Sequence, residues 1–440
     1  MITKILGGIG LETVQIIGIL LVFIVFVGLM MTRKLTTLLA LPMMAILLAA
    51  IAGIPLLSDN PDTFTITKGV LAGGAMKLST AIAGLIFGAW FGQILSKVGI
   101  TKTIIRKAAE LAGDKPLAIA VIFFLAASVI FSAANGLGMV ILVGTIAIPI
   151  MLTAGLKPFV SGLVVLLANA VGVVFNVSTW AIYTDVLKVP TNTIASYSLI
   201  CAVPLIVIAL IMIVYYTRKD GKVRRAWAMP LKQEFQSQGT KNVRSIALIS
   251  PLVPVLLVFF LKVDIVSAVF MGALVTLLLA TPKRPIHVLS SALVEGIQDV
   301  AGALGLMIGI GMLLSAVTAP QVASLIQPLI EGIIPTSPLM YILVFTLLSP
   351  LAIYRGPLNV WGLGSGIAAL IVAGGMAPVA AMLALRIVSN LQAVSDPTNS
   401  HNVWISDFTR TDIIETLRKT LPWMFVAVMI SMIIAGLVAF

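Results

Sequence analysis

Apolar residues occur along this chain in long runs, separated by short polar segments. A helix needs about 20 mostly apolar residues to cross the hydrocarbon core of a bilayer. Runs of that order predict five spans in each half of the chain: 13–32, 36–57, 70–97, 159–187 and 193–216 in the first, and 246–262, 264–281, 287–317, 379–405 and 421–440 in the second. The alternating segments of a transmembrane β-barrel are absent from the sequence. The pattern therefore predicts an all-α polytopic membrane protein.

Two further apolar segments, 116–153 and 338–373, are interrupted by residues that a bilayer interior disfavours. The first break is Ser132-Ala133-Ala134-Asn135-Gly136, and the second is Arg355-Gly356-Pro357. Arms of about 15 residues reach only ~22 Å at 1.5 Å per residue, which is short for a full span. We predict re-entrant hairpins, whose irregular tips must be covered by protein or line a water-filled cavity. Two tilted full spans at each place are the alternative.

The second half repeats the backbone-breaking residues of the first at a distance of 356 − 136 = 220 residues. Five spans and one hairpin make an odd number of crossings, so the halves must have inverted topology. We predict a first repeat at 1–216, a basic linker at 217–244 and a second repeat at 245–440. The pairs at this distance are Gly136 and Gly356, Gly144 and Gly364, Gly155 and Gly375, Pro158 and Pro378, Asn176 and Asp396, and Ser178 and Thr398.

The charges agree with inversion and set the orientation. The amphipathic segment 98–115 is basic, whereas its counterpart 319–335 contains no Lys or Arg, as expected for opposite membrane faces. The linker carries eight Lys or Arg residues against Asp220 and Glu234, which predicts a cytoplasmic position beside lipid headgroups. We expect a bacterial-type inner (cell) membrane protein with both termini external.

The composition supports a membrane protein and argues against a soluble domain and against a nucleic-acid-binding protein. The 440 residues are 60% hydrophobic and only 10% charged, whereas soluble domains carry roughly a quarter charged residues. The net charge of +12 arises from loops that follow the positive-inside rule, so we expect no nucleic-acid partner. Cys201 is the only cysteine, so no intrachain disulfide can form.

Broken helices supply the candidate binding chemistry. Half-helix N-termini favour anions, while freed carbonyl groups and C-terminal ends favour cations. A second pair of breaks, at Asn176-Val177-Ser178-Thr179 and at Ser395-Asp396-Pro397-Thr398-Asn399, interrupts spans 159–187 and 379–405. The expected substrate-binding residues are Arg355, Gly356, Asn359, Ser132, Asn135, Gly136, Asn176 and Thr398, and the expected ion-coupling residues are Asp396, Asn399, Ser178 and Thr179, with Na⁺ as a candidate at Asp396, Asn399 and Ser178.

Arg355 is the most distinctive of these residues. A permanent cation near the membrane midplane needs an anionic partner, and a guanidinium group binds a carboxylate in a bidentate fork. Arg355 is either a clamp for a substrate carboxylate or the partner of a protein carboxylate such as Asp396. Asp396 itself is either a coupling residue or the cap of the half-helix that follows. Arg386 is a second buried cation, or else it extends outward to the membrane surface.

The stretch from about 350 to 425 resembles the end of gluconate permeases and related carboxylate carriers of the ion transporter superfamily. The similar residues are Ser389-Asn390, Ser395-Asp396-Pro397 and Asp412-Ile413-Ile414-Glu415-Thr416-Leu417. The resemblance implies inverted repeats with hairpins and broken helices, an elevator-like motion and a homodimer. It departs from gluconate permeases at Asn176-Val177-Ser178-Thr179-Trp180, where those proteins carry a His- and Pro-rich break, and at Arg355.

These observations predict a secondary active transporter of a small organic anion, most simply a carboxylate, coupled to Na⁺ or H⁺ symport. We expect no enzyme activity and no cofactor, because Walker, zinc-protease and paired-cysteine motifs are missing from the sequence. A cation/proton antiporter without an organic substrate is the alternative. A membrane-embedded enzyme or a channel is a third class, and the discontinuous helices at matching repeat positions weigh against it.

Overall fold

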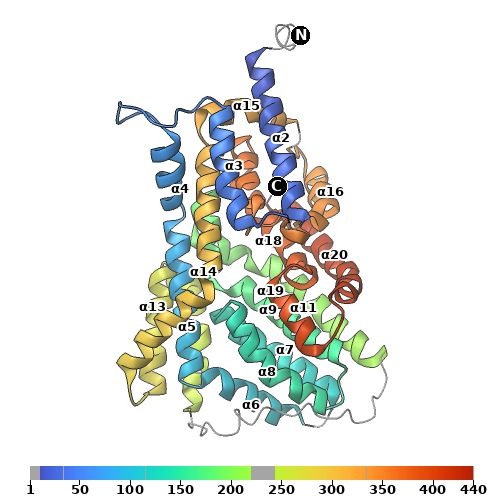
Figure 1. Ribbon diagram of the computed structural model, residues 1–440. Helices are drawn as coiled ribbons and strands as arrows, with labels where there is room; N and C mark the ends of the chain where they lie inside the picture. Colours follow the sequence, from blue (N-terminus) through green and yellow to red (C-terminus); the bar gives the residue numbers. More distant parts are fainter. Residues whose placement is uncertain (1–9, 33, 114, 220–242, 333, 440) are drawn as a thin grey trace.

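Helices form every regular element in the part of the chain that the computed structural model describes, residues 10–439 without 33, 114, 220–242 and 333 (Figure 1). Eight of the helices in these residues are long and apolar enough to cross a membrane. The first half contains α2 (Leu11–Met31), α3 (Thr37–Ile51), η2 (Ile66–Ala72), α4 (Gly73–Met76), α5 (Ser79–Lys97), α6 (Ile100–Ala112), α7 (Pro116–Ala133), α8 (Leu137–Thr153), α9 (Pro158–Phe175), α10 (Val177–Leu187) and α11 (Thr191–Lys219).

The second half presents a matching order of elements. It contains η4 (Ser245–Leu252), α12 (Val253–Leu261), α13 (Ile265–Ala280), α14 (Pro285–Val317), α15 (Pro320–Glu331), α16 (Pro338–Leu348), η5 (Ser349–Arg355), α17 (Leu363–Ala373), α18 (Pro378–Ser395), α19 (Ser400–Thr409) and α20 (Ile413–Val438). The fold class predicted from the sequence is therefore confirmed.

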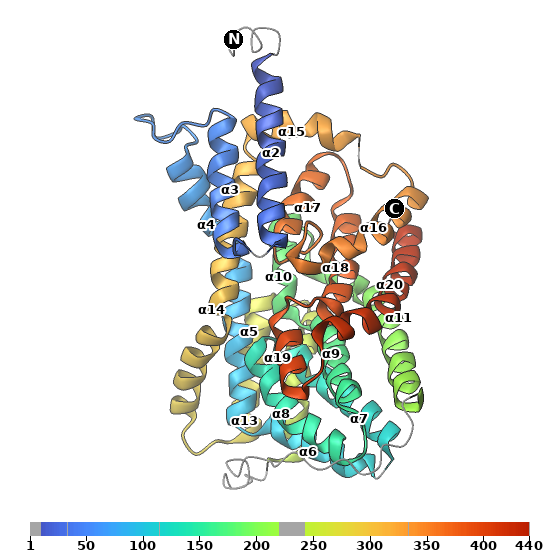
Figure 2. The same ribbon diagram turned by 45° about the vertical axis from the view of Figure 1, so that its right-hand side comes forward.

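The two halves are inverted relative to each other. The short helix α6 lies at the lower end of the molecule in Figures 1 and 2, and its counterpart α15 lies at the upper end. Between them, α5 and α14 pack along each other and run in opposite directions. No membrane is part of the structure, so the cytoplasmic side and the external termini stay predictions from the basic loops. Most of the predicted linker, 220–242, lies outside the described residues, as do residues 1–9.

Packing between the halves is reciprocal. Helix α3 packs on α14, and its counterpart α13 packs on α5. In the same way, α8 packs on α19 while α17 packs on α10. The self-equivalent pairs are α5 with α14, α9 with α18 and α11 with α20. This exchange of partners is what a pseudo-two-fold axis between inverted repeats produces.

The segments 116–153 and 338–373 fold as re-entrant hairpins rather than as pairs of full spans. Both arms of the first hairpin, α7 and α8, pack on α6, so both of its ends lie at the same end of the molecule. The arms of the second hairpin, α16 and α17, lie in the upper part of Figure 2, near α15. The second tip is wider than predicted because irregular backbone continues from Gly356 to Gly362 between η5 and α17.

Glycines allow the central helices to approach closely. A Cβ atom added to Gly74 would lie 2.5 Å from Cα of Met312, and one added to Gly296 would lie 2.8 Å from the backbone N of Trp90. Ser315 Oγ of α14 also donates a hydrogen bond to the carbonyl of Gly69, 2.8 Å away. Small residues at helix contacts are the usual means of tight packing in a membrane, where water provides no hydrophobic drive between helices.

The last helix begins earlier than predicted. We expected a span at 421–440 preceded by Arg418 and Lys419, whereas α20 starts at Ile413 and includes both residues. The reason is an N-cap: Asp412 Oδ1 accepts a hydrogen bond from the backbone N–H of Ile414 at 3.0 Å. The ion pair between Lys419 and Glu415, 2.6 Å long, then lies within the first two turns of the helix.

Candidate functional site

The first helix break is centred on Asn176, which lies between α9 and α10 in an extended conformation. Its Oδ1 atom accepts a hydrogen bond from the N–H of Ser178 at 3.1 Å and so caps α10. Its Nδ2 atom donates to the carbonyl of Phe131 in α7 at 3.2 Å. Asn176 is buried, so this one side chain joins the helix break to the tip of the first hairpin.

The second break, around Asp396, uses the same kind of local hydrogen bond but is wider, because α19 begins only at Ser400. The Oδ1 atom of Asp396 accepts hydrogen bonds from the N–H of Thr398 at 2.8 Å and from Thr398 Oγ1 at 2.7 Å. Asn399 Oδ1 then accepts from the N–H of His401 at 3.3 Å, where α19 begins. Asp396 is fully buried. The cap that we weighed for Asp396 is therefore wrong: Asn399 is the N-cap of α19, and Asp396 Oδ1 instead holds the turn at Thr398 between α18 and α19.

The carbonyl groups at the two breaks correspond as well. Trp180 Nε1 donates to the carbonyl of Val174 at 3.0 Å, and Asn402 Nδ2 donates to the carbonyl of Val394 at 3.1 Å. Val174 and Val394 are again 220 residues apart, as 394 − 174 = 220. In both halves a side chain of the second half-helix thus satisfies a carbonyl group at the end of the first half-helix, as the termini of a broken helix require.

Arg386 of α18, in the second half of the chain, donates hydrogen bonds to groups at and near the first break. Its guanidinium group donates to the carbonyls of Val174 and Ile194 and to Ser198 Oγ, and it lies 5.2 Å from the ring centroid of Trp180. It is buried and forms no ion pair with a carboxylate among the described residues. Its charge instead faces the negative end of the α9 dipole and an aromatic face. Arg386 therefore does not extend to the membrane surface.

Helix α5 packs against Ser178 and against the tip of the first hairpin. A Cβ atom on Gly88 would lie 2.2 Å from Ser178 Oγ, and one on Gly92 would lie 2.6 Å from Ala134 Cβ at the hairpin tip. Thus α5 contacts the break and the tip together. The Ser178 hydroxyl is buried without a hydrogen-bond partner among the described residues.

The other polar groups of the first half are used locally. Ser132 Oγ donates to the carbonyl of Val129, and Thr179 Oγ1 donates to the carbonyl of Asn176. Asn135 Oδ1 accepts from the N–H of Gly136 at 2.8 Å. Gly136 has φ +126°, a conformation that side chains disfavour, which explains a glycine at the tip. Asn135 is half-buried, so its amide is the most accessible of the predicted donors here.

The tip of the second hairpin is organised by Asn359. Its Oδ1 atom accepts from the N–H of Trp361 at 2.9 Å, and its own carbonyl accepts from the N–H groups of Gly362 and Gly364. Gly356 begins this tip with extended backbone. The side chain of Arg355 lies outside the described part of the structure, so its role as a clamp stays a prediction. Within the described residues no hydrogen bond joins Asn359 to Asp396, and none joins Ser178 to Asp396 or Asn399.

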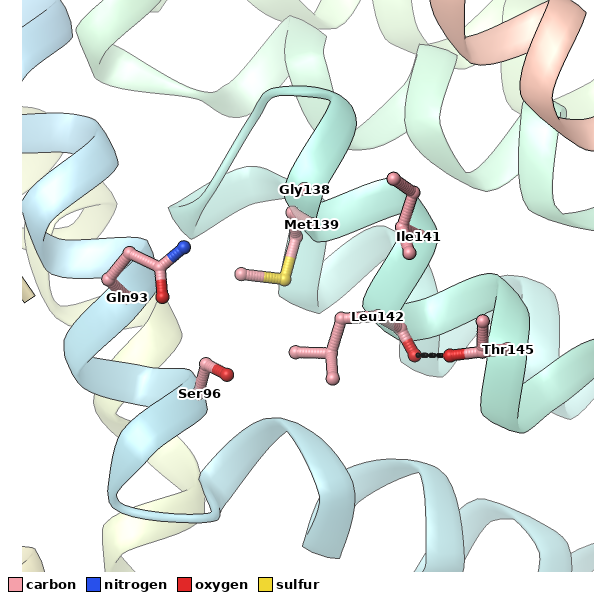
Figure 3. A pocket seen from close by; sticks show the side chains of 7 residues that line it. All are labelled: Gln93, Ser96, Gly138, Met139, Ile141, Leu142 and Thr145. Atoms are coloured by element: carbon pink, nitrogen blue, oxygen red, sulfur yellow. Dashed lines mark hydrogen bonds between the residues drawn. The ribbon is translucent and has the colours of Figure 1, made fainter. Parts of the chain in front are cut away.

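A cavity of about 300 Å³ lies between α5 and the second arm of the first hairpin (Figure 3). Figure 3 shows Gln93 on one side and Met139 and Leu142 on the other, facing the space between them. None of the predicted site residues lines it. The lining residues are Gln93, Ser96, Gly138, Met139, Ile141, Leu142 and Thr145.

Asp299 of α14 borders this cavity and was missed in the sequence. Gln93 Nε2 donates to Asp299 Oδ2 at 2.6 Å, and a Cβ atom on Gly138 would lie 2.6 to 2.9 Å from the three carboxyl atoms of Asp299. Both neighbours line the cavity. The available signal was an acidic residue in the middle of a long apolar helix, which in a membrane protein is a functional candidate by default.

The described residues contain no group of three or more His, Cys, Asp or Glu side chains that could hold a metal ion. The Na⁺ site predicted at Asp396, Asn399 and Ser178 contains one carboxylate and two neutral side chains, and it stays a prediction.

Comparison with known proteins gives the fold a precedent. No protein-family model matches the chain, and no curated protein matches it in sequence. The structure is similar to the crystal structure of the YdaH transporter of Alcanivorax borkumensis, which is described as having an unusual topology, with a TM-score of 0.62 and 14% sequence identity. The similarity covers 91% of this chain and 97% of that chain. It lends no support to the predicted resemblance to gluconate permeases, but it shows that this chain has the fold of a membrane transporter.

Proposed function

We propose that the protein is a secondary active transporter of a small organic anion, a carboxylate, coupled to symport of Na⁺ or H⁺. The observation that carries the proposal is the pair of broken helices at Asn176 and Asp396, built alike in inverted halves. Broken helices with this relation form the substrate and ion sites of many secondary transporters. The similarity of the fold to a transporter supports the same class.

The choice of an anion rests on helix ends. At each break a half-helix, α10 or α19, presents its N-terminus inside the protein, where its N–H groups and dipole favour negative charge. Arg386 is committed to carbonyl groups and to Ser198, so it is not available to a substrate. Arg355 at the second tip is then the cation we assign to the substrate carboxylate, with Asn135, Gly136, Gly356, Asn359, Asn176, Ser132 and Thr398 as neutral partners.

The ion is assigned to the second break. Asp396 uses Oδ1 for the turn at Thr398, while Oδ2 has one long contact, 3.5 Å from Gln392 Nε2. Oδ2 is the atom that would bind Na⁺ or a proton, with Asn399, Ser178 and Thr179 as the further predicted ion-coupling residues.

The packing between the hairpins and the central helices differs between the halves. A cavity separates α5 from α8, whereas in the other half α17 packs on α14, with Leu313 3.2 Å from where a Cβ of Gly366 would stand. An opening in one half and a packed contact in the other is the asymmetry expected of a carrier that exposes its site to one side at a time. We expect a homodimer with an elevator-like motion, as the family resemblance implies.

Cation/proton antiport without an organic substrate is the second candidate. The acidic residues Asp299 and Asp396 in membrane helices favour it, since carboxylates suit cations and protons rather than anions. Antiport predicts exchange of cations for protons in proteoliposomes that contain no organic anion, whereas symport predicts none.

A thermal-shift screen tests the proposal directly. Purified protein is heated with a panel of mono-, di- and tricarboxylates, each with Na⁺ and with K⁺ in its place. A ligand at 100 times its Kd stabilises the native state by about 2.7 kcal/mol, so a true substrate raises the Tm and a non-substrate does not. Uptake of the best ligand by proteoliposomes follows. A panel with no stabilising anion, together with cation exchange, would favour antiport instead.

A further inference from the structure

Asp299 carries a negative charge that the described structure does not balance. Its hydrogen-bond donor is the neutral amide of Gln93, 2.6 Å away, and it belongs to no ion pair among the described residues. A carboxylate at membrane depth without a cationic partner is costly, and such residues mark ion or proton pathways. We therefore expect the balancing cation among the ions in solution, a proton or Na⁺.

The neighbouring charged groups are already paired or distant. Lys97 of α5 and Glu295 of α14, one helical turn from Asp299, form an ion pair of 2.6 Å. The other helices that pack nearby, α3, α8 and α17, contain no charged residue. Lys68 of η2 and Lys77 after α4 lie toward the opposite end of α14, where Lys77 donates to Thr318 Oγ1 at 2.8 Å. Glu331 is the last residue of α15, which comes after the C-terminal end of α14 in the chain, the end opposite to the one where α14 begins.

The two acidic candidates differ in access. Asp396 is fully buried and is not among the residues that line the cavity between α5 and α8. Asp299 is exposed, and it contacts two of the residues that line this cavity, Gln93 and Gly138. A hydrated cation can therefore reach Asp299 through existing space, whereas Asp396 would first have to be uncovered.

A change in the charge of Asp299 would also affect the first hairpin, which is the part of a carrier that we expect to move. Gly138 is the second residue of α8, so the carboxylate lies against the first turn of a hairpin arm. The positive end of a helix dipole attracts a carboxylate and loses that attraction when the charge is neutralised. Binding of a cation at Asp299 would thus loosen the contact between the first hairpin and α14.

From these contacts we propose that Asp299 is the first site to take up the coupling cation, a proton or Na⁺, ahead of Asp396. The cation competes with the hydrogen bond from Gln93, and neutralisation of the carboxylate releases the first hairpin from α14. This inference rests on the proposed transport function for its meaning, but the contact and its response to cations are independent of any organic substrate.

Thiol labelling of the hairpin tests the proposal without transport. Leu142→Cys places a thiol on the hairpin wall of the cavity, and Ser96→Cys places one on the α5 wall, each in a Cys201→Ala background. The ratio of their maleimide labelling rates cancels the effect of pH on thiol reactivity. The ratio is measured in K⁺ buffer from mildly alkaline to mildly acidic pH, and then at alkaline pH with increasing Na⁺, always without organic anions.

We expect acid, Na⁺ or both to raise the ratio about two- to fivefold, the size of a lost helix-dipole interaction. Asp299→Asn keeps the shape and a hydrogen-bond acceptor for Gln93 but removes the charge, so its ratio should be high and constant. The double variant Lys97→Met, Glu295→Gln is the matched control, because it removes an acid one helical turn from Asp299 together with its paired cation, and it should respond like the parent. A response to acid alone identifies the proton, and a response to Na⁺ alone identifies the metal ion.

A parent ratio that changes with neither cation would overturn the proposal. So would an Asp299→Asn protein that responds like the parent, above all if Asp396→Asn abolishes the response instead. Gln93→Leu serves if Asp299→Asn does not fold: it leaves the carboxylate without its donor, so the Na⁺ response should appear at lower concentration. A positive labelling result with no anion found in the thermal-shift screen would leave this inference standing and remove the proposed substrate class.

Discussion

Arg386 shows at the residue scale how a buried cation is used when no carboxylate accompanies it. Its hydrogen bonds end on two carbonyl groups and a hydroxyl, and its charge lies beside Trp180. The sequence of an apolar helix does not show which elements will pack on each of its faces. Arg386 could therefore have been a buried cation or a side chain that extends to the membrane surface, and only the packing distinguishes the two. The corresponding residue of the first repeat is Leu166, because 386 − 220 = 166. The two breaks are therefore secured differently.

Replacement of Arg386 by Met should lower stability without a change in any substrate contact. The carbonyl of Ile194 and the hydroxyl of Ser198 would keep the hydrogen bond between them but lose their charged donor. A hydrogen bond to a charged group contributes about 1.5–3 kcal/mol. We expect a loss of about 2–4 kcal/mol, measured as a fall in Tm by differential scanning fluorimetry in detergent. Ser198→Ala removes one partner only and should cost less. Equal Tm values for Arg386→Met and the parent would show that these hydrogen bonds contribute nothing.

Arg355→Ala should abolish anion uptake while the protein remains in the membrane. The guanidinium is the proposed carboxylate clamp, and a charge-assisted bidentate contact has no neutral substitute. Uptake of radiolabelled anion by proteoliposomes gives the measurement, with the exposed Arg418→Ala as the matched arginine control. Arg355→Lys should retain weak uptake with a raised KM, since the charge remains but the fork is lost. Normal uptake by Arg355→Ala would remove the clamp.

At the scale of elements, the helix breaks were the part that the sequence predicts best. Asn and Asp accept a local hydrogen bond from an N–H two residues later, so the breaks at Asn176 and Asp396 could be placed without tertiary knowledge. The start of the helix after the second break was predicted less well, because Asn399 rather than Asp396 caps α19. The hydrogen bond from Asn176 to the carbonyl of Phe131 could not be predicted from the sequence, because the two residues lie 45 positions apart. The cavity was missed for the same reason: Gln93 and Asp299 are polar residues inside apolar runs, and only packing brings them to one place.

Substitutions at Asp396 separate a turn-forming acceptor from an ion site. Asp396→Asn keeps an Oδ1 acceptor for Thr398, so stability should stay close to that of the parent, while Asp396→Ala should lose about 1 kcal/mol with the hydrogen bonds from Thr398. If Asp396 also binds the coupling ion, both variants lose cation-driven accumulation but Asp396→Asn keeps its Tm. Accumulation by Asp396→Asn at the parental level would show that Asp396 serves only as the acceptor for Thr398 in the turn.

The contact between the first hairpin and α9 depends on Gly172. A Cβ atom there would lie 2.4 Å from Phe131 Cβ and 2.8 Å from the carbonyl oxygen of Ser128, too close for either to remain in place. Gly172→Ala should therefore destabilise the protein by about 1–3 kcal/mol, as overpacking does. Gly302→Ala is the matched control, because nothing lies within 4 Å of its added Cβ and alanine favours a helix by up to about 1 kcal/mol. Similar Tm values for the two variants would contradict this packing.

At the scale of the whole molecule, inversion places α6 and α15 on opposite sides of the membrane. In intact cells, an impermeant maleimide should label Gln321→Cys in α15 and leave Lys102→Cys in α6 unlabelled until the cells are opened. Both positions are exposed, and the buried Cys201 is replaced by Ala in each variant. Labelling of Lys102→Cys alone would reverse the orientation predicted from the basic loops, and labelling of both from outside would contradict inversion.

The reciprocal packing of α3 on α14 and of α13 on α5 also sets the order in which the protein can be completed during synthesis. When α3 leaves the ribosome, its partner α14 has not been made, and 317 − 51 = 266 residues separate the ends of the two helices. At about 5–20 residues per second, the wait is on the order of tens of seconds. Throughout that interval the first half stands in the lipid with two partner faces unoccupied. During biogenesis the first half must therefore remain in the bilayer with these faces unpacked until the second, inverted half has been synthesised.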